Sequence, residues 1–286
     1  MTHCSDVQVE PLPGTAKKAE VYVLFEWPKG WSRDVLDGDT FGPELTAALK
    51  KKLGTASLQL IRRPGRQGHS DCGHYRCFVV WAKEGLVKAH VLRSPEEILD
   101  LDLEHPEGEC LPLTLVCTHA KRDVCCALKG RPLAAELAEE FGENVWETSH
   151  TKGHRFAPSV LLMPWGYSFG RLNAEAGRQL MRASLRGEYF YPANRGCGLY
   201  SPAGQVAELA VARQLLDASE ALYYGDLTVE PVEGAAAAGS RVTVRHADGR
   251  AWSVELDTRE VSGTISSCGD EPKTSTALVA KAVSSA

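Results

Sequence analysis

The chain has 286 residues, 43% of them hydrophobic, so it is long enough to bury a large core and to form more than one domain. Its 32 Lys and Arg residues are balanced by 37 Asp and Glu residues, which gives a net charge of -5 and argues against nucleic acid as the main partner. The first residues are polar and no stretch approaches roughly 18 consecutive apolar residues, so we expect a soluble, cytoplasmic protein with no membrane partner.

The first part of the chain, residues 1–107, has the composition of an α/β domain. An irregular arm comes first, and β-branched and aromatic residues then mark four strands. Two further segments have helical composition, and Gly54 is suited to end the first of them. The predicted strands are 20–27, 56–63, 75–82 and 86–92, and the predicted helices are 43–53 and 95–101.

Residues 108–187 repeat this order of elements. An apolar strand at 111–116 ends at Cys117, and Asp123 caps a helix that Pro132 should interrupt or restart. The remaining predicted elements are a strand at 144–148, a hairpin at 159–164 and 167–170, and a helix that Asn173 caps and Gly187 ends. Strand, helix, strand, hairpin and helix is the order of the thioredoxin fold. We therefore predict an α/β protein with a thioredoxin-like domain at 108–187, preceded by a degenerate thioredoxin-like repeat.

The dipeptide Ala157-Pro158 supports this fold beyond the order of elements. Thioredoxin-like folds carry a cis proline before the third core strand, and here the apolar run S-V-L-L-M follows Pro158 directly. An X-Pro bond adopts the cis form at a cost of only about 0.5 to 1 kcal/mol, so we expect this peptide to be cis. Pro158 would then face the loop at Cys117, and the histidines just before it would lie on the same side of the domain.

The last hundred residues are predicted to be an addition to this core. Residues 188–261 read as a turn-rich connector, a helix opened by Ser201-Pro202, and a small β appendage. The predicted strands of the appendage are 227–232, 241–246 and 251–256, with the turn signal Asp248-Gly249 between the last two. From residue 262 to residue 286 the composition favours a disordered tail.

Two cysteines and two histidines form the strongest candidate site. Cys117 and Cys126 are nine residues apart, His150 and His154 are four apart, and about one helix of sequence separates the two pairs. Two thiolates and two imidazoles are a complete set of ligands for zinc or for an iron-sulfur cluster. Nine cysteines in a chain without an export signal also indicate metal ligation or thiol chemistry rather than disulfides.

The run C-T-H-A-K-R-D-V-C-C together with H-T-K-G-H-R-F-A-P resembles the sucrase/ferredoxin-like family, whose members are thioredoxin-fold proteins that carry a 2Fe-2S cluster. The resemblance covers most of residues 1–190. It implies that Cys117, Cys126, His150 and His154 hold the cluster, with Cys126 rather than the adjacent Cys125 in the ligand position. It further implies a ferredoxin-like role in electron transport with a redox partner protein, either a reductase or an acceptor, rather than a stand-alone enzyme. Proton-coupled redox at the histidine ligands would follow.

Two other functions remain open from the residues alone. Two cysteines with His-x3-His also satisfy tetrahedral zinc, so a structural or regulatory zinc module is the first alternative. A thiol-disulfide oxidoreductase using Cys125 or Cys126 is the second, weakened because no C-x-x-C pair stands at the helix start. His119 is a spare ligand candidate, although at its spacing from Cys117 a hydrogen bond within the loop is the more frequent role.

The remaining candidates have simpler interpretations. A second group of cysteines and histidines lies in and after a mobile connection, where the residues suit a loop and a buried strand better than a metal site. Its members are His69, Cys72, His74 and Cys77. Cys110 and Cys197 are interpreted as structural, Cys4 and Cys268 lie near the ends of the sequence, and Lys121, Arg122 and Arg155 place positive charge on the loops around the site.

Overall fold

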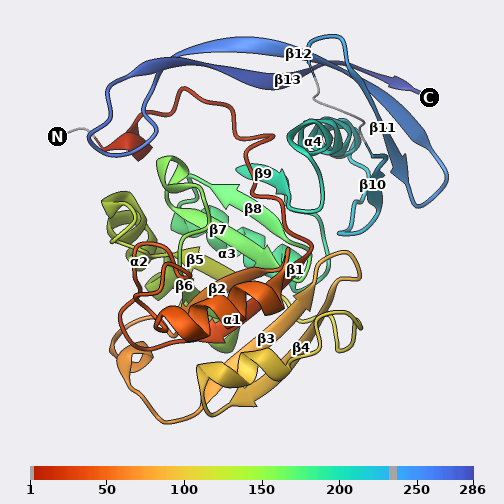
Figure 1. Ribbon diagram of the computed structural model, residues 1–286. Helices are drawn as coiled ribbons and strands as arrows, with labels where there is room; N and C mark the ends of the chain where they lie inside the picture. Colours follow the sequence, from red (N-terminus) through yellow and green to blue (C-terminus); the bar gives the residue numbers. More distant parts are fainter. Residues whose placement is uncertain (1–2, 232–236) are drawn as a thin grey trace.

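The computed structural model describes residues 3–231 and 237–286, and two β-sheets are formed within them (Figure 1). Among these residues the larger sheet has nine strands, in the order β4 (Leu86–Leu92), β3 (Tyr75–Trp81), β1 (Val21–Glu26), β2 (Ser57–Arg62), β6 (Val145–Thr148), β5 (Leu113–Cys117), β7 (Ser159–Met163), β8 (Tyr167–Gly170) and β9 (Asn194–Cys197). The smaller sheet has the order β10 (Leu227–Val229), β11 (Arg241–His246), β12 (Ala251–Thr264) and β13 (Lys273–Ser285).

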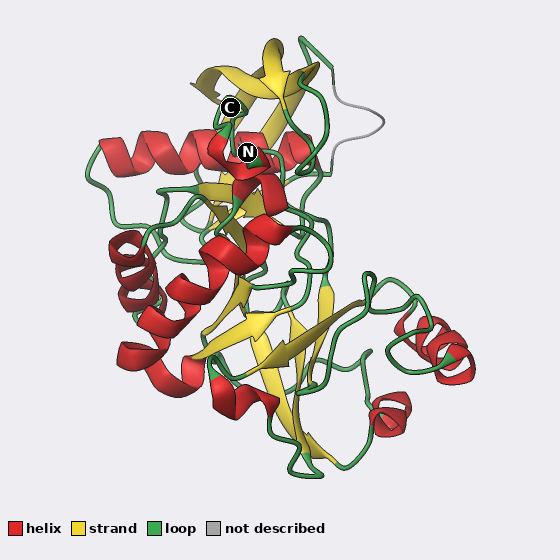
Figure 2. Cartoon of the chain, turned by 90° about the vertical axis from the view of Figure 1, so that its left-hand side faces the viewer, coloured by secondary structure: helices red, strands yellow, loops and turns green. Residues whose placement is uncertain are grey.

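Helices lie on both sides of the larger sheet (Figure 2). The α-helices are α1 (Pro43–Leu53), α2 (Val124–Phe141), α3 (Ala174–Ser184) and α4 (Pro202–Asp217). The short 3-10 helices are η1 (Cys4–Asp6), η2 (Arg66–His69), η3 (Pro95–Asp100), η4 (Gly142–Asn144) and η5 (His154–Phe156). In the part of the chain that the structure describes, no helix is both long and apolar enough to cross a membrane.

Both halves of the larger sheet use the same strand pairings. In the first half, β1 pairs in parallel with β2 and antiparallel with β3, which pairs antiparallel with β4. In the second half, β5 pairs in parallel with β6 and antiparallel with β7, which pairs antiparallel with β8. Helices α1 and α2 connect the two parallel pairs, because parallel neighbours need a crossover. An antiparallel contact of β2 with β6, where Ile61 lies opposite Thr148, joins the halves into one sheet.

The central strands are buried along their whole length because both of their faces are covered. Every residue of β2, β5, β6 and β7 is buried, a pattern typical of strands that lie between two layers. Helix α2 covers β5 and β6 with Leu133, Ala134 and Leu137. The bounds of α1, β4 and β11 are those predicted from the sequence, and the Ala157-Pro158 peptide is cis as predicted. Met163-Pro164 is a second cis peptide.

Two local predictions need correction. Pro132 neither interrupts nor restarts its helix, because α2 runs unbroken from Val124 to Phe141 with Pro132 inside it. The proline removes one backbone hydrogen bond, but buried residues before it (Cys126, Ala127) and after it (Leu133, Leu137) keep both parts of the helix packed. Residues 194–197 were assigned to a connector, whereas they form β9, which pairs antiparallel with β8.

The expectation of a disordered tail from residue 262 also differs from the structure. Residues 251–264 and 273–285 form a long antiparallel hairpin, β12 and β13, paired from Trp252 opposite Ser285 to Thr264 opposite Lys273. Most side chains of β13 are exposed or half-buried, since it is the edge strand of the smaller sheet. Its polar, small-residue composition therefore resembles that of a tail, although β12 supplies its backbone hydrogen bonds. In Figure 1 this hairpin arches over the molecule, and its closed end lies beside η1.

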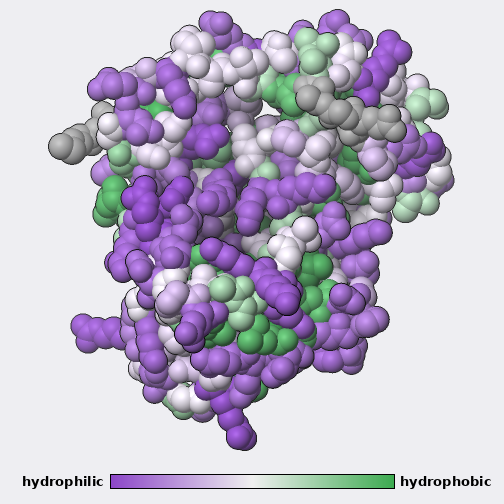
Figure 3. All heavy atoms as spheres, viewed as in Figure 1, coloured by the Kyte–Doolittle hydropathy of each residue, from purple (hydrophilic) through white to green (hydrophobic). Residues whose placement is uncertain are grey.

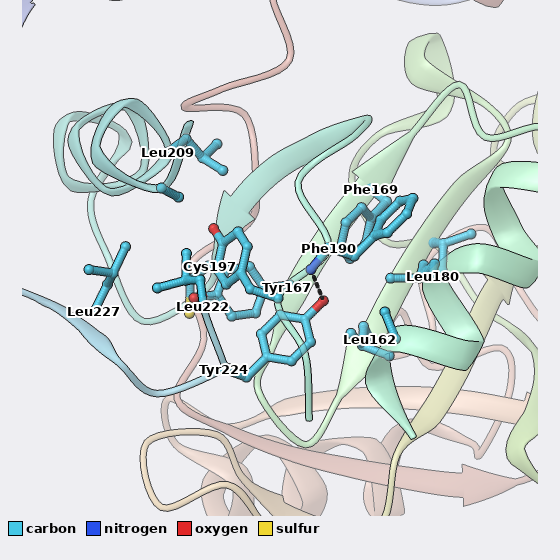
Figure 4. Packing of buried hydrophobic residues seen from close by; sticks show 14 of the residues in the cluster. Leu162, Tyr167, Phe169, Leu180, Phe190, Cys197, Leu209, Leu222, Tyr224 and Leu227 are labelled. Carbon is cyan, nitrogen blue, oxygen red and sulfur yellow. Dashed lines mark hydrogen bonds between the residues drawn. The ribbon is translucent and has the colours of Figure 1, made fainter. Parts of the chain in front are cut away.

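One shared core connects the larger sheet, α4 and the smaller sheet (Figure 4). Tyr167, Tyr189 and Tyr224 pack ring against ring within it, with centroids 5.0 to 5.4 Å apart. Glu208 of α4 is fully buried among them, and its carboxylate accepts hydrogen bonds from the hydroxyls of Tyr167 and Tyr189. On the outside, the face shown in Figure 3 is mainly hydrophilic, with hydrophobic side chains visible between charged ones.

Candidate functional site

Three of the four predicted ligands come together at one edge of the larger sheet. Cys117 is the last residue of β5, Cys126 lies in the first turn of α2, and His150 follows β6; their ligand atoms lie within 4.8 Å of one another. β5 and β6 are parallel neighbours, with Cys117 opposite Thr148, so the residues after both strands emerge at the same edge. Both thiols are fully buried.

The N-terminus of α2 is held against the end of β5. Asp123 is the N-cap, and its Oδ1 accepts a hydrogen bond from the backbone N–H of Cys125 at 2.9 Å, which orients the first turn. One turn further on, a Cβ added at Gly130 would lie 2.1 Å from the carbonyl oxygen of Cys117. Only glycine permits this close approach. The cap and the glycine together place the Cys126 side chain beside Cys117.

His154 lies next to this group but is tied to another part of the chain. Its ring centroid is 5.2 Å from that of His150, while its Nε2 is 2.7 Å from the carbonyl oxygen of Ser266 and 3.0 Å from Oγ of Ser267. A carbonyl only accepts hydrogen bonds, so Nε2 carries the proton and Nδ1 keeps its lone pair. Within residues 3–231 and 237–286 the buried Nδ1 atoms of His150 and His154 have no hydrogen-bond partner. In this tautomer, Nδ1 is the nitrogen of His154 whose lone pair is available to a metal.

The electrostatics of the two thiols favour a thiolate at Cys117. A hydrogen bond from Cys126 and the neighbouring His150 lower the pKa of Cys117 well below its ordinary value, against the opposing effect of burial. The pKa of Cys126 is raised, first because its thiol donates to Cys117 and then because it is buried. Burial lowers the pKa of His154, which favours the neutral imidazole that a metal requires.

A buried arginine stands behind the histidine loop. Arg195 is fully buried, and its guanidinium donates to Oγ of Ser159 at 3.1 Å, to Oγ1 of Thr15 at 3.0 Å and to the carbonyl of Lys152 at 3.2 Å. A Cβ at Gly153, between the two histidines, would lie 2.3 Å from its Nη1. Burial lowers the pKa of Arg195 to about 9. The guanidinium donates to uncharged oxygens, so its positive charge is available to offset negative charge in the adjoining site.

Among the described residues, the other ligand candidates do not belong to this group. His119 is buried and edge-on to Trp31, with ring centroids 5.7 Å apart, and neither ring nitrogen has a hydrogen-bond partner among the described residues, so the expected loop hydrogen bond is not formed. Cys77 is buried in β3 and Cys72 is exposed; neither belongs to a group of metal-ligating side chains within residues 3–231 and 237–286. The same holds for His69 and His74 in that part of the chain.

Two of the three predicted positive residues of the loops, Arg122 and Arg155, are paired with acidic residues from other parts of the chain. Arg122 lies 3.4 Å from Asp34, and Arg155 lies 2.8 Å from Glu10. Lys152 also approaches Asp34, at 3.7 Å. These ion pairs attach the loop after β1 and the N-terminal arm to the loops that carry the site.

A second group was missed from the sequence. Cys4, Asp123, Cys125 and Cys268 bring their ligand atoms within 4.8 Å of one another on the other side of the α2 N-terminus. Cys4 and Cys268 lie near the two ends of the sequence, 264 residues apart, so their spacing does not indicate a common site. The one available signal was the vicinal pair Cys125-Cys126: successive residues of a helix point about 100° apart, so the two thiols face different neighbours.

Comparison with known sequences agrees with the motif. Residues 12–196 match the model of the sucrase/ferredoxin-like family. The matched region contains Cys117, Cys126, His150 and His154 as well as Arg195, and it leaves out the smaller sheet. No curated protein and no solved structure matches the chain.

Proposed function

Because the chain belongs to the sucrase/ferredoxin-like family, we propose that it is an electron-transfer protein with one 2Fe-2S cluster held by Cys117, Cys126, His150 and His154. The observation that carries the proposal is the convergence of the first three side chains within 4.8 Å, with the ring of His154 beside that of His150. We also interpret the second half of the larger sheet as the thioredoxin-like domain and the first half as its degenerate copy, on the basis of their equal strand pairings.

The residues present fit such a cluster chemically. Two buried thiols supply anionic sulfur, and the buried Nδ1 of His154 is free for ligation while Nε2 is held by Ser266. When bound, a cluster of this kind supplies one-electron transfer, and neutral imidazoles in place of two thiolates raise its potential. Arg195 would offset the negative charge gained on reduction. A redox partner protein, a reductase or an acceptor, would approach at the histidine loop, where His150 is partly exposed.

We further propose that the histidines couple electron uptake to proton uptake. Each ligating imidazole would keep one N–H, which at His154 is the Nε2–H donated to Ser266. Additional negative charge in the site raises the pKa of that N–H, so the reduced form holds the proton to a higher pH than the oxidised form. The carbonyl of Ser266 favours the protonated ring in both forms.

Serine variants of the adjacent cysteines test the ligand assignment. Cys117→Ser and Cys126→Ser should lose the visible absorption and the electron paramagnetic resonance signal of the reduced cluster, because a thiolate is removed from the site. Cys125→Ser is the matched control, since its thiol faces the second group, and its spectrum should stay close to that of the wild type. If Cys125→Ser loses the cluster while Cys126→Ser keeps it, the ligand assignment is wrong by one residue.

Zinc in the same site is the competing proposal, because the three clustered donors also suit a tetrahedral ion. A protein that is colourless after anaerobic purification, and that loses zinc on Cys117→Ser, would support zinc and exclude the cluster. A red-brown protein that bleaches with dithionite would support the cluster. A thiol-disulfide activity at Cys125 or Cys126 would instead require a reversible disulfide of Cys126 with Cys117, or of Cys125 with Cys4 or Cys268.

A further inference from the structure

Three cysteines from distant parts of the chain form a triangle of sulfur atoms. Cys4 lies in η1, Cys125 in the first turn of α2, and Cys268 in the turn between β12 and β13. Their Sγ atoms are 3.6 Å apart for Cys4 and Cys125, 3.2 Å for Cys125 and Cys268, and 3.6 Å for Cys4 and Cys268. Oδ1 of Asp123 lies 3.3 Å from Sγ of Cys268 and 3.9 Å from Sγ of Cys4.

These distances match the face of a thiolate tetrahedron. Zinc-sulfur bonds of about 2.3 Å place tetrahedral sulfur atoms about 3.8 Å apart, which is about 0.2 to 0.6 Å more than the three distances here. A disulfide needs a sulfur separation of about 2.05 Å and joins only two of three cysteines. Three thiols and a carboxylate oxygen around one point are therefore better explained by a metal ion than by a disulfide.

The surroundings of Asp123 agree with this interpretation. Its carboxylate is buried, and its two oxygens accept backbone N–H groups from Cys125 at 2.9 Å and Cys268 at 3.0 Å. These bonds fix the orientation of the carboxylate and leave lone pairs directed at the thiols, as in the outer contacts of metal ligands. Among residues 3–231 and 237–286, the basic atom paired with this carboxylate is Nε2 of His154, which is 3.9 Å from Oδ2 and is already hydrogen-bonded to Ser266. A divalent cation would offset the charge of this buried carboxylate.

We propose that Cys4, Cys125, Cys268 and Asp123 bind one zinc ion at a site separate from Cys117, Cys126, His150 and His154. The ion would join three segments that share no sheet: the N-terminal arm, the start of α2 and the closed end of the β12–β13 hairpin. Figure 1 shows these segments side by side at one end of the hairpin. The role is structural, because all four coordination positions are filled by the protein.

Metal analysis of full-length, cluster-loaded protein tests the proposal. Wild-type protein purified under reducing conditions from zinc-supplemented medium should contain one zinc ion per chain besides its iron. Cys4→Ser and Cys268→Ser should each lose the zinc while keeping the iron and the visible spectrum. Cys72→Ser and Cys110→Ser are the matched controls, since both cysteines are exposed and outside either group, and they should keep the zinc.

Several outcomes would overturn the zinc site. The first three are wild-type protein without zinc, retention of zinc in both Cys4→Ser and Cys268→Ser, and additional iron in place of zinc. The fourth is a Cys125–Cys268 disulfide, detected by mass spectrometry, that persists in protein purified under reducing conditions. Wild-type protein that contains zinc but no iron would contradict the electron-transfer proposal and leave the zinc site intact. The experiment therefore distinguishes failure of one proposal from failure of the other.

Cobalt(II) keeps the test decisive if a serine variant does not fold. Wild-type, cluster-loaded protein freed of zinc and titrated with Co²⁺ should develop a thiolate-to-cobalt charge-transfer band that saturates at one equivalent. The same titration of Cys110→Ser should give the same band. Absence of the band from folded wild-type protein would overturn the proposal.

Discussion

Glu208 is a fully buried acid whose ionisation should affect the free energy of unfolding. Its Oε1 accepts from two tyrosine hydroxyls, and its Oε2 has no partner among the described residues. Burial raises the pKa of Glu208 from 4.5 to about 7, although the hydrogen bonds from Tyr167 and Tyr189 act in the opposite direction. The folded protein therefore binds a proton at Glu208 over a pH range in which the unfolded chain has released it.

This proton makes stability depend on pH in a defined direction. Below pH 4.5 both states hold the proton; between 4.5 and 7 only the folded state does, so the free energy of unfolding falls as pH rises. The fall is about 1.4 kcal/mol per pH unit, or about 3 kcal/mol in total, and it ends above the folded-state pKa. Urea unfolding from pH 4 to pH 8 should show a steeper decline for the wild type than for Glu208→Gln.

Glu175→Gln is the matched control for Glu208→Gln, because Glu175 lies exposed at the start of α3. Its stability should follow the wild-type pH profile. Parallel profiles for wild type and Glu208→Gln would contradict the burial-driven shift, since other titrating groups are common to both proteins.

At the scale of elements, the contact of α2 with the end of β5 decides whether the two thiols meet. Gly130→Ala would bring a methyl group into the carbonyl of Cys117, a backbone atom that cannot rotate away. We expect a loss of about 1 to 3 kcal/mol in the free energy of unfolding, together with reduced cofactor occupancy at Cys117 and Cys126. Chemical denaturation and the iron content of the purified protein measure the two effects.

Gly177→Ala is the control within the same bundle of helices. A Cβ at Gly177 would meet only side-chain carbons of Leu137 and Leu133, at 3.2 Å and beyond, which can shift. Alanine also favours a helix over glycine by about 1 kcal/mol, so the net change should be small and occupancy unchanged. Equal losses in Gly130→Ala and Gly177→Ala would show that the contact with Cys117 has no special role.

The elements that the sequence predicts well are those with local signals. Caps at Asp123 and Asn173, the apolar runs of the central strands and the turn signals before β12 are all contained in a few neighbouring residues. β9 and β13 were missed because each depends on a partner strand for its hydrogen bonds and has little hydrophobic pattern of its own. The continuity of α2 through Pro132 likewise depends on packing against the sheet.

The candidate site divides in the same way. The sequence predicts a common site for Cys117, Cys126, His150 and His154, and the structure brings the first three together because the parallel strands β5 and β6 end at one edge. The contact of His154 with Ser266, across 112 residues, cannot be read from spacing. The proximity of Arg195 to the site cannot be predicted from spacing either, because its position depends on β9 and on the absence of a side chain at Gly153.

At the scale of the molecule, the closed end of the β12–β13 hairpin connects the C-terminal sheet to the histidine loop. Ser266 holds the Nε2–H of His154, and the same turn contributes Cys268 to the second group. The protonation of His154 therefore depends on an element outside the region matched by the family, which ends at residue 196. The residues matched by the family model therefore do not include this hydrogen-bond acceptor of His154.

The pH dependence of the midpoint potential tests this connection. In the wild type the potential should be flat at low pH and then fall by roughly 59 mV per pH unit for each coupled proton. Thr264 and Lys273 are paired, so an Asn-Gly turn can replace residues 265–272 and remove the carbonyl of Ser266. The fall should then begin at lower pH, because the protonated ring of His154 loses its acceptor.

Cys268→Ser separates this effect from the loss of the second group, since it keeps the turn and the carbonyl of Ser266. Its potential should follow the wild-type profile. A pH-independent potential in the wild type would exclude proton coupling at the histidines, and an unchanged onset in the shortened hairpin would exclude control by Ser266.

The hairpin that covers the histidine loop is synthesised after the predicted ligands. A ribosome releases this sequence from its amino end, so Cys117, Cys126, His150 and His154 all emerge more than a hundred residues before Ser266 does. Until β13 has been synthesised and has paired with β12, the side of the histidine loop that the turn later covers remains open to solvent. Insertion of a cofactor before that point would therefore meet an uncovered site, and closure of the hairpin would follow it.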